Sequence, residues 1–251
     1  ELKQKFKGVE YTRRLESRLR DEGYVTLGIP GGTTTLMAAM MTASPEVVSM
    51  LLKYGTNVES VDSMGNDAFM FASSFGRPKN LQCWLQRVKN WDLNRQNSVI
   101  GSCALSVAIY QGSNKLDTVK LLLDAGAALE YTSFSGSSAL TNAVDNEDSD
   151  PDVIRVLLER CETLCGGKGT TRFKSIVNYR TQATTFKRKG INLIAKTMLR
   201  TGLTNSRLMA YVAMKAKITA LNLAVVRGDV EIVKLLLENG ADPYVENDLG
   251  M

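Results

Sequence analysis

The chain has 251 residues, a hydrophobic content of 44%, a formal net charge of +5 at pH 7 and no histidine. The absence of histidine removes the commonest general base, so Ser-His-Asp and Cys-His catalysis are excluded within these residues. The sequence contains no apolar run of about 18 residues, so it predicts no membrane-spanning helix. Its four cysteines form no C-x-x-C pair, and we expect reduced thiols of an intracellular, cytoplasmic protein, with no metal and no cofactor.

Residues 1–27 are charged, and Leu2, Phe6 and Val9 are spaced for one apolar face of a helix. Charges of both signs are typical of a solvated helix face. We predict a helix that caps the end of the structure that follows it. A helix that binds a partner is the alternative.

Residues 28–162 repeat a helix–turn–helix pattern. The corresponding apolar positions Leu36, Phe69, Leu105 and Leu140 are spaced by 33, 36 and 35 residues. In each unit a short apolar helix is followed by a turn and then by a second apolar helix. One such unit has more apolar surface than it can bury alone, so the sequence predicts that neighbouring units stack.

An acidic cluster lies at the start of the second helix of the fourth unit. Asp148 could begin a calcium-binding loop, but Val153 stands where that loop requires glycine. The segment from Asp150 to Asp152 fits better as an N-cap followed by an acidic first turn. We therefore predict a helix start at this point and no calcium site.

The glycine-rich segment 166–171 has some features of a phosphate-binding loop. That motif requires glycine where Glu162 stands, and it requires serine or threonine where Gly169 stands. We predict a flexible linker that binds no phosphate.

The segment 163–218 is strongly basic. Between Thr163 and Gly228 the sequence has 13 basic residues and no acidic residue, whereas the rest of the chain has a net charge of −8. Residues 187–200 have the period of an amphipathic helix with an apolar face and a basic face. The apolar face comprises Ile191, Ile194, Ala195, Met198 and Leu199, and the candidate partner-binding residues are Lys187, Arg188, Lys189, Lys196 and Arg200.

Three kinds of surface suit a basic amphipathic helix. The helix can pack against the acidic remainder of its own chain, contact an acidic surface of another protein, or lie on an anionic membrane. Nucleic acid is disfavoured as a partner, because the segment has few aromatic residues that could stack on bases.

Residues 219–251 carry the clearest copy of the repeat. The motifs T-A-L-N-L-A, I-V-K-L-L-L and G-A-D-P begin at Thr219, Ile232 and Gly240, and Gly228 and Asp229 stand at the turn between the helices. This copy resembles the ankyrin repeat, which runs T-P-L-H-x-A, a glycine turn, I-V-x-L-L-L and G-A-D. The resemblance implies an all-α, ankyrin-type helix–turn–helix solenoid with projecting hairpin loops, interrupted by the basic insertion at 163–218. Where the family usually has histidine, this chain has Met37, Met70, Ser106, Thr141 and Asn222.

The resemblance also implies a non-enzymatic protein–protein interaction scaffold, or a structural subunit, that binds a partner through its loops and concave helices. A peripheral membrane adaptor held by the helix at 187–200 is the alternative. Among the large side chains of the projecting loops, Met64 and Phe134 are candidate contacts; packing on the neighbouring loop is the alternative for each. Glu1 is not an initiator, and residues 247–251 look like the start of a further repeat, so we expect a longer protein.

Overall fold

The computed structural model describes residues 31–246, apart from 112–113, 207–208, 210–211 and 214. The predicted capping helix at 1–27 and the start of a further repeat at 247–251 lie outside the described residues. Within the described residues the fold is all-α, as predicted, and the backbone bridge between Val61 and Asp67 belongs to no strand.

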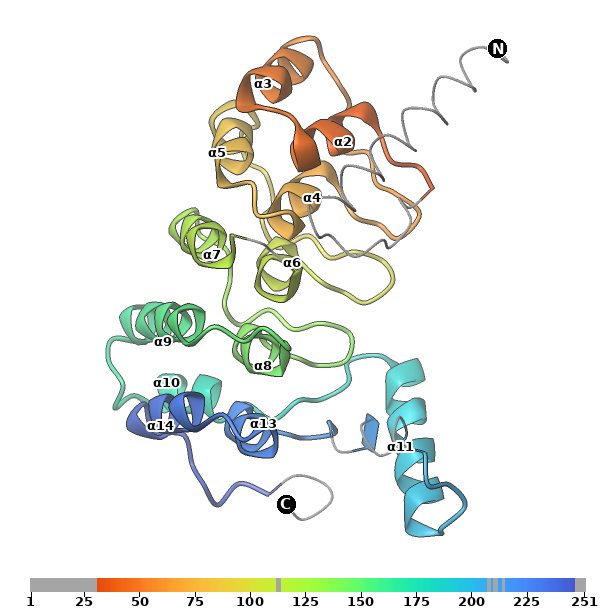
Figure 1. Cartoon of the computed structure of the whole chain (residues 1–251), viewed down its shortest axis with the longest axis vertical. Coiled ribbons are helices and arrows are strands. Elements are labelled where there is room, and N and C mark those ends of the chain that lie inside the picture. The colour runs from red at the N-terminus through yellow and green to blue at the C-terminus, as the bar shows by residue number, and fades with distance from the viewer. Residues whose placement is uncertain (1–30, 112–113, 207–208, 210–211, 214, 247–251) are drawn as a thin grey trace.

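Two rows of stacked helices make up the solenoid (Figure 1). Each repeat contributes one helix to each row, and equivalent helices of neighbouring repeats pack against each other. The last repeat packs directly on the fourth, although residues 163–218 separate the two in sequence. The stacked-repeat prediction is therefore confirmed. The inner row comprises α2 (Thr35–Thr42), α4 (Ala68–Ser74), α6 (Ala104–Gln111), α8 (Ala139–Asp145) and α13 (Ala220–Arg227), and the outer row comprises α3 (Pro45–Lys53), α5 (Pro78–Arg87), α7 (Lys115–Asp124), α9 (Pro151–Cys165) and α14 (Val230–Glu238).

Local capping signals fix ends of α9, α13 and α14 as the sequence predicts. Gly228 ends α13 in the left-handed region, with φ 73°. Asp229 caps α14, because its Oδ1 accepts a hydrogen bond from the backbone N–H of Ile232 (3.0 Å). Asp150 caps α9 in the same way by accepting from the N–H of Asp152 (2.9 Å). The acidic cluster therefore begins a helix, as we predicted.

An apolar core runs between the two rows of helices. Its bulkiest side chains lie in the second repeat, where Phe69 of α4 and Trp84 of α5 are fully buried with ring centroids 6.0 Å apart. Trp91 packs edge-on against Trp84, with ring centroids 5.0 Å apart. Tilted and edge-on contacts of this kind stabilise aromatic clusters beyond the area that they bury. This aromatic cluster is the main apolar anchor of the second repeat.

Asp67 is a buried carboxyl group that caps α4. Its Oδ1 accepts from the backbone N–H of Met70 (2.8 Å), and Nε of Arg95 lies 3.8 Å from its Oδ2. Burial raises the pKa of Asp67, because these favourable contacts only partly offset the loss of water around the charge. The folded state therefore keeps the proton at a pH where the unfolded state has lost it. The contribution of this group to stability falls as the pH rises above its unfolded pKa of about 3.9.

We predict that the free energy of unfolding of Asp67→Asn rises relative to that of the wild type between about pH 4 and pH 7. Asparagine keeps a capping oxygen but has no charge to bury. Asp67→Ala is the control for the cap, and it is expected to lower the free energy of unfolding by about 1 kcal/mol. Urea denaturation at several pH values measures both effects. A difference between D67N and the wild type that stays constant with pH would contradict the prediction.

The glycine-rich segment is a turn over residues 166–170, and it leads into a helix that the sequence analysis did not predict. Gly166 ends α9, and Thr170 caps α10 (Thr171–Val177) by accepting from the backbone N–H of Phe173 (3.2 Å). Phe173 and Val177 are buried, and α10 packs on α9. The sequence analysis singled out the glycines before this helix and overlooked the apolar pair Phe173 and Val177, whose spacing of four residues is typical of a helix.

Candidate interaction surface

Projecting loops follow one another along the solenoid, as the resemblance implies. Each is closed at its base by a backbone hydrogen bond of 2.9 to 3.1 Å, in which Asp62 donates to Asn66, Asn97 to Ser102 and Ser133 to Ser137. Successive loops are also joined to each other. The N–H of Ser98 donates to the carbonyl of Met64 (3.0 Å), and the N–H of Phe134 donates to that of Ile100 (2.9 Å). The loops therefore form a connected row.

The basic segment enters the corresponding loop of the last repeat. The N–H of Thr181 donates to the carbonyl of Ile218 (3.0 Å), which matches the bond that closes each shorter loop. Residues 182–217, here called the loop insertion, therefore occupy the tip of this loop and include α11 (Phe186–Arg200). Figure 1 shows α11 beside the stack and away from the outer helices.

A second contact supports this alignment of the last loop with the loops of the earlier repeats. Asn178, three positions before Thr181, accepts through Oδ1 from the N–H of Asp242 (2.7 Å). Asn94 stands at the matching place in an earlier repeat, and its Oδ1 accepts from the N–H of Ala128 (2.9 Å). The chain therefore returns to the ankyrin-like register just before the loop insertion begins.

The two loop residues that we single out from the sequence have different surroundings. Met64 is exposed in its loop. Phe134 is half-buried and packs over Gly101 of the neighbouring loop, where a Cβ atom would lie 2.4 Å from its ring. The carbonyl of Phe134 also accepts from the N–H of Thr184 (3.1 Å). Phe134 thus packs between neighbouring loops, whereas Met64 is accessible to a partner.

Some basic residues of the segment 163–218 pair with the solenoid. Nη2 of Arg172 lies 2.8 Å from Oε1 of Glu130, and the ammonium group of Lys215 forms an ion pair with the half-buried carboxylate of Asp145. These pairs join the basic segment to the acidic repeats. Packing against the protein's own acidic surface, one of the three arrangements that we expect, therefore applies to Arg172 and Lys215.

The candidate residues on α11 are arranged differently. Lys187 and Lys189 are exposed, and the described residues include no acidic partner within ion-pair distance of either. Lys196 is half-buried. The side chains of Arg188 and Arg200 lie outside the described residues. Among the described side chains of α11, the two N-terminal lysines thus supply the exposed positive charge.

The outward face of α11 is apolar as well as basic. Phe186 is 93% exposed, Leu193 66% and Ile194 56%, whereas Ala195 is buried on the opposite side. Nζ of Lys189 lies 5.8 Å from the ring centroid of Phe186. The sequence pattern assigned Ile194 to the apolar face of the helix and left out Phe186 and Leu193. The spacing of seven residues between these two, about two helical turns, is the signal that identifies the outward face.

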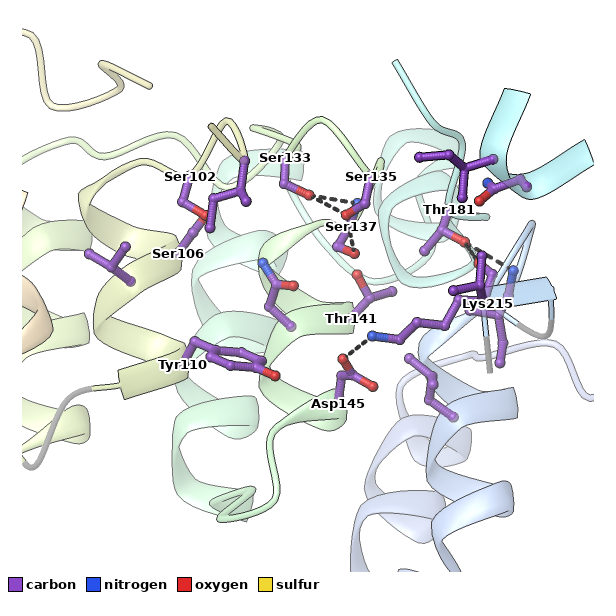
Figure 2. A pocket seen from close by; sticks show the side chains of 18 residues that line it. Ser102, Ser106, Tyr110, Ser133, Ser135, Ser137, Thr141, Asp145, Thr181 and Lys215 are labelled. Carbon is purple, nitrogen blue, oxygen red and sulfur yellow. Dashed lines mark hydrogen bonds and ion pairs between the residues drawn. The ribbon is translucent and has the colours of Figure 1, made fainter. Parts of the chain in front are cut away.

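A cavity of about 330 Å³ separates the loop insertion from the inner helices α6 and α8. Figure 2 shows hydroxyl groups of several loops and helices around it, together with the ion pair of Lys215 and Asp145. The hydroxyls of Ser133 and Ser135 are 2.8 Å apart, and those of Ser135 and Ser137 are 3.2 Å apart. No sequence pattern indicated this cavity, because its walls come from segments far apart in the chain.

The part of the chain that the structure describes contains no group of three or more residues arranged to hold a metal ion. Cys161 and Cys165 are free, with their sulfur atoms 4.0 Å apart. Burial, followed by the neighbouring Cys165, raises the pKa of Cys161 to about 12, so this thiol stays protonated at neutral pH. Within the described ranges, no helix is both long and apolar enough to cross a membrane.

Sequence comparison identifies the family. A profile described as "Ankyrin repeats (3 copies)" matches residues 69–166, and one described as "Ankyrin repeat" matches residues 217–248. The chain belongs to the ankyrin-repeat family. The resemblance seen in the last repeat therefore extends over most of the stack.

Two known proteins are similar to part of this chain in sequence. The chain is 33% identical over 116 residues to the nuclear factor NF-kappa-B p105 subunit of Gallus gallus, and 30% identical over 115 residues to a B-cell lymphoma 3 protein homolog of Mus musculus. These matches cover 46% and 45% of this chain but 12% and 25% of the two relatives. The crystal structure of the ankyrin repeat domain of Bcl-3, described as a unique member of the IkappaB protein family, superposes with a TM-score of 0.61 and 24% sequence identity. The superposition covers 95% of this chain and 84% of the Bcl-3 chain, and the similarity concerns the fold.

In the last two repeats, the residues that stand where ankyrin repeats usually have histidine make hydrogen bonds of their own. Asn222 accepts through Oδ1 from the N–H of Thr219 (3.2 Å), and its Nδ2 donates to the carbonyl of Val245 (3.3 Å). Oγ1 of Thr141 accepts from the N–H of Ser138 (2.7 Å). These bonds hold the start of each inner helix, and Asn222 also reaches the following loop.

Proposed function

We propose that this chain is a non-enzymatic protein–protein interaction scaffold, or a structural subunit of a larger assembly, in the cytoplasm. It binds a protein partner through its projecting loops and inner helices, and the loop insertion adds an electrostatic contact. The ankyrin-repeat fold supports an interaction role, because it presents loops and an extended face on a rigid stack. The name of the chicken relative describes a subunit, which supports a place within an assembly.

The outward face of α11 is the observation that carries this proposal. Phe186, Leu193 and Ile194 are large apolar side chains exposed to solvent, and exposed apolar side chains that cluster are typical of interaction sites. Lys187 and Lys189 lie on the same helix and are exposed. An acidic partner surface with an apolar centre complements this face in both charge and polarity. Met64, Lys196, Arg188 and Arg200 complete the proposed contact set.

Charge reversal of the two exposed lysines tests the electrostatic contact. The double variant Lys187→Glu, Lys189→Glu is expected to bind a partner captured from native extract at least about tenfold more weakly than the wild type, a difference of about 1.4 kcal/mol. The affinity of the wild type is expected to fall as the salt concentration rises. Capture on immobilised protein, followed by a binding titration with the purified partner, measures both effects.

The matched control reverses two exposed lysines on outer helices, Lys53 and Lys120, and so changes the net charge by the same amount. It is expected to bind like the wild type. An equal loss of affinity in the control would show that net charge is responsible, and an unchanged affinity in the α11 variant would overturn the proposed contact.

A peripheral membrane adaptor is the second candidate, because exposed apolar and basic side chains on one helix also suit an anionic membrane. Here α11 would lie on the lipid surface while the repeats recruit a protein. Sedimentation with vesicles of neutral lipid, and of neutral lipid mixed with anionic lipid, tests this function. Stronger binding to the anionic vesicles, lost in the variant with Lys187 and Lys189 reversed, would support the adaptor; equal binding to both would exclude it.

A further inference from the structure

The cavity beside the loop insertion exists because of the length of this loop. Residues 63–65, 98–101 and 134–136 form the tips of the shorter loops, whereas residues 182–217 form the tip of the last one. Its outer wall comes from Ile191, Asn192, Val212 and Lys215 of the loop insertion. The facing wall comes from α6, α8 and the loops that precede them.

Two sets of contacts hold the outer wall in place. The N–H of Lys217 donates to the carbonyl of Thr181 (2.9 Å), and the hydroxyl of Thr181 donates to the carbonyl of Lys215. The side chain of Lys215 then crosses to α8 and pairs with Asp145, as Figure 2 shows. The wall is therefore attached to the solenoid both at its base and across the cavity.

The chemistry of the lining favours an uncharged occupant. The charges of Lys215 and Asp145 compensate each other, and the other polar groups among the described lining residues are hydroxyls and amides. An isolated phosphate, carboxylate or ammonium group that entered the cavity would lose its hydrating water without gaining an ion-pair partner from the described lining. Ile191, Val212, Ile218 and Leu223 add apolar surface, which an aliphatic or aromatic group would cover.

The size and position of the cavity favour a peptide over a metabolite. Its volume of about 330 Å³ lies at the lower end of the range of roughly 300–1,000 Å³ for small-molecule sites. Ile100, Tyr110 and Ser135 line the cavity and are exposed, so it opens onto the surface between the loops and the inner helices. This is the surface to which we assign the protein partner. Hydroxyl groups can both donate and accept, which suits the alternating N–H and C=O groups of an extended backbone.

We infer that this cavity binds one large apolar side chain of an extended, uncharged segment of a protein partner. The main chain on either side of that anchor bonds to the hydroxyls of Ser135 and Ser137. The inference rests on the proposed scaffold function and names the anchor that the scaffold recognises. A single buried apolar anchor that contributes most of the affinity is a common arrangement in protein interfaces.

The probes are the N-acetyl, N-methylamide derivatives of leucine, phenylalanine, glycine, glutamate and lysine, together with adenosine and glucose. Methyl NMR spectra of the full chain report on Ile191, Ile218 and Leu223. The leucine or phenylalanine probe is expected to shift these methyl signals at millimolar concentration, whereas the glycine, glutamate and lysine probes leave them unmoved. Shifts from the charged probes of equal size, shifts from adenosine or glucose alone, or no shifts at all would overturn the inference.

Ile191→Trp fills the cavity from the side of α11 and is expected to weaken binding of the apolar probe at least fivefold. Thr197→Trp is the matched control, because it places the same side chain at an exposed position of the same helix that does not line the cavity. Val212→Phe gives a second way to fill the cavity if I191W is unfolded by circular dichroism. Equal binding by the cavity-filling and control variants would contradict the inference.

The two proposals fail in different ways. If a protein partner is captured and depends on Lys187 and Lys189, but no probe moves the methyl signals, the scaffold function stands and the cavity inference falls. If apolar probes shift the methyl signals but no protein partner is captured, the scaffold function fails and the preference of the cavity for apolar groups stands.

Discussion

Trp84→Ala is expected to lower the free energy of unfolding by about 3–5 kcal/mol. The side chain is fully buried against Phe69 and Trp91, so truncation removes apolar contacts and leaves a cavity in the second repeat. Because each repeat contacts only its neighbours, the loss also weakens the stacking of the second repeat on the first and on the third. Urea denaturation followed by circular dichroism measures the change.

Trp84→Phe tests how much of this stability comes from packing of the aromatic ring. Within the described residues, Nε1 of Trp84 is buried and has no hydrogen-bond partner. Phenylalanine removes that unsatisfied donor while keeping a ring in the cluster, so its loss of stability is expected to be much smaller than that of W84A. Equal losses in the two variants would contradict the assignment of this stability to ring packing.

Gly136→Ala is expected to lower the free energy of unfolding by about 3 kcal/mol or more. Gly136 has φ 82°, which is unfavourable for alanine, and an added Cβ would lie 2.0 Å from the carbonyl oxygen of Gln182. The first residue of the loop insertion would have to move away from the preceding loop. Thermal unfolding gives the change in stability, and limited proteolysis reports whether the loop insertion becomes more accessible.

Gly55→Ala is the control for this prediction. Gly55 has a similar φ of 77°, but an added Cβ would meet no atom within 4 Å. It is expected to lose about 1–2 kcal/mol from backbone strain alone and to keep the wild-type cleavage pattern. If G55A and G136A lose equal stability, the close packing of Gln182 on Gly136 contributes nothing.

Local sequence signals predict the solenoid well. The Gly228–Asp229 turn, the cap at Asp150 and the recurrence of Leu36, Phe69, Leu105 and Leu140 each depend on residues within one helix or one repeat. Such signals specify element boundaries without knowledge of distant contacts. The all-α stack, the five repeats and the family all follow from them.

The functional surface follows less well from the sequence, because it depends on contacts between distant residues. The bond between Thr181 and Ile218 places α11 in a loop, and no local pattern links those two positions. The ion pair of Lys215 and Asp145 contributes to the cavity wall, whereas the sequence analysis counted these residues only toward the charge of their segments. Phe186 and Leu193 were missed for another reason: the predicted apolar face was defined by a different set of residues of the helix, and these two exposed side chains lie outside that set.

The hydrogen-bonded ends of the loop insertion allow the segment between them to be replaced by a different one. The chain leaves the stack at Thr181 and re-enters it at Ile218, so the segment between them can change length without shifting the register of α13 on α8. Closing a flexible loop of twice the length adds only about 0.6 kcal/mol of entropic cost. Relatives that share this stack can therefore diverge in partner choice by exchanging one segment, and a reporter domain or a foreign recognition peptide can be grafted at the same two residues while the repeats keep their packing.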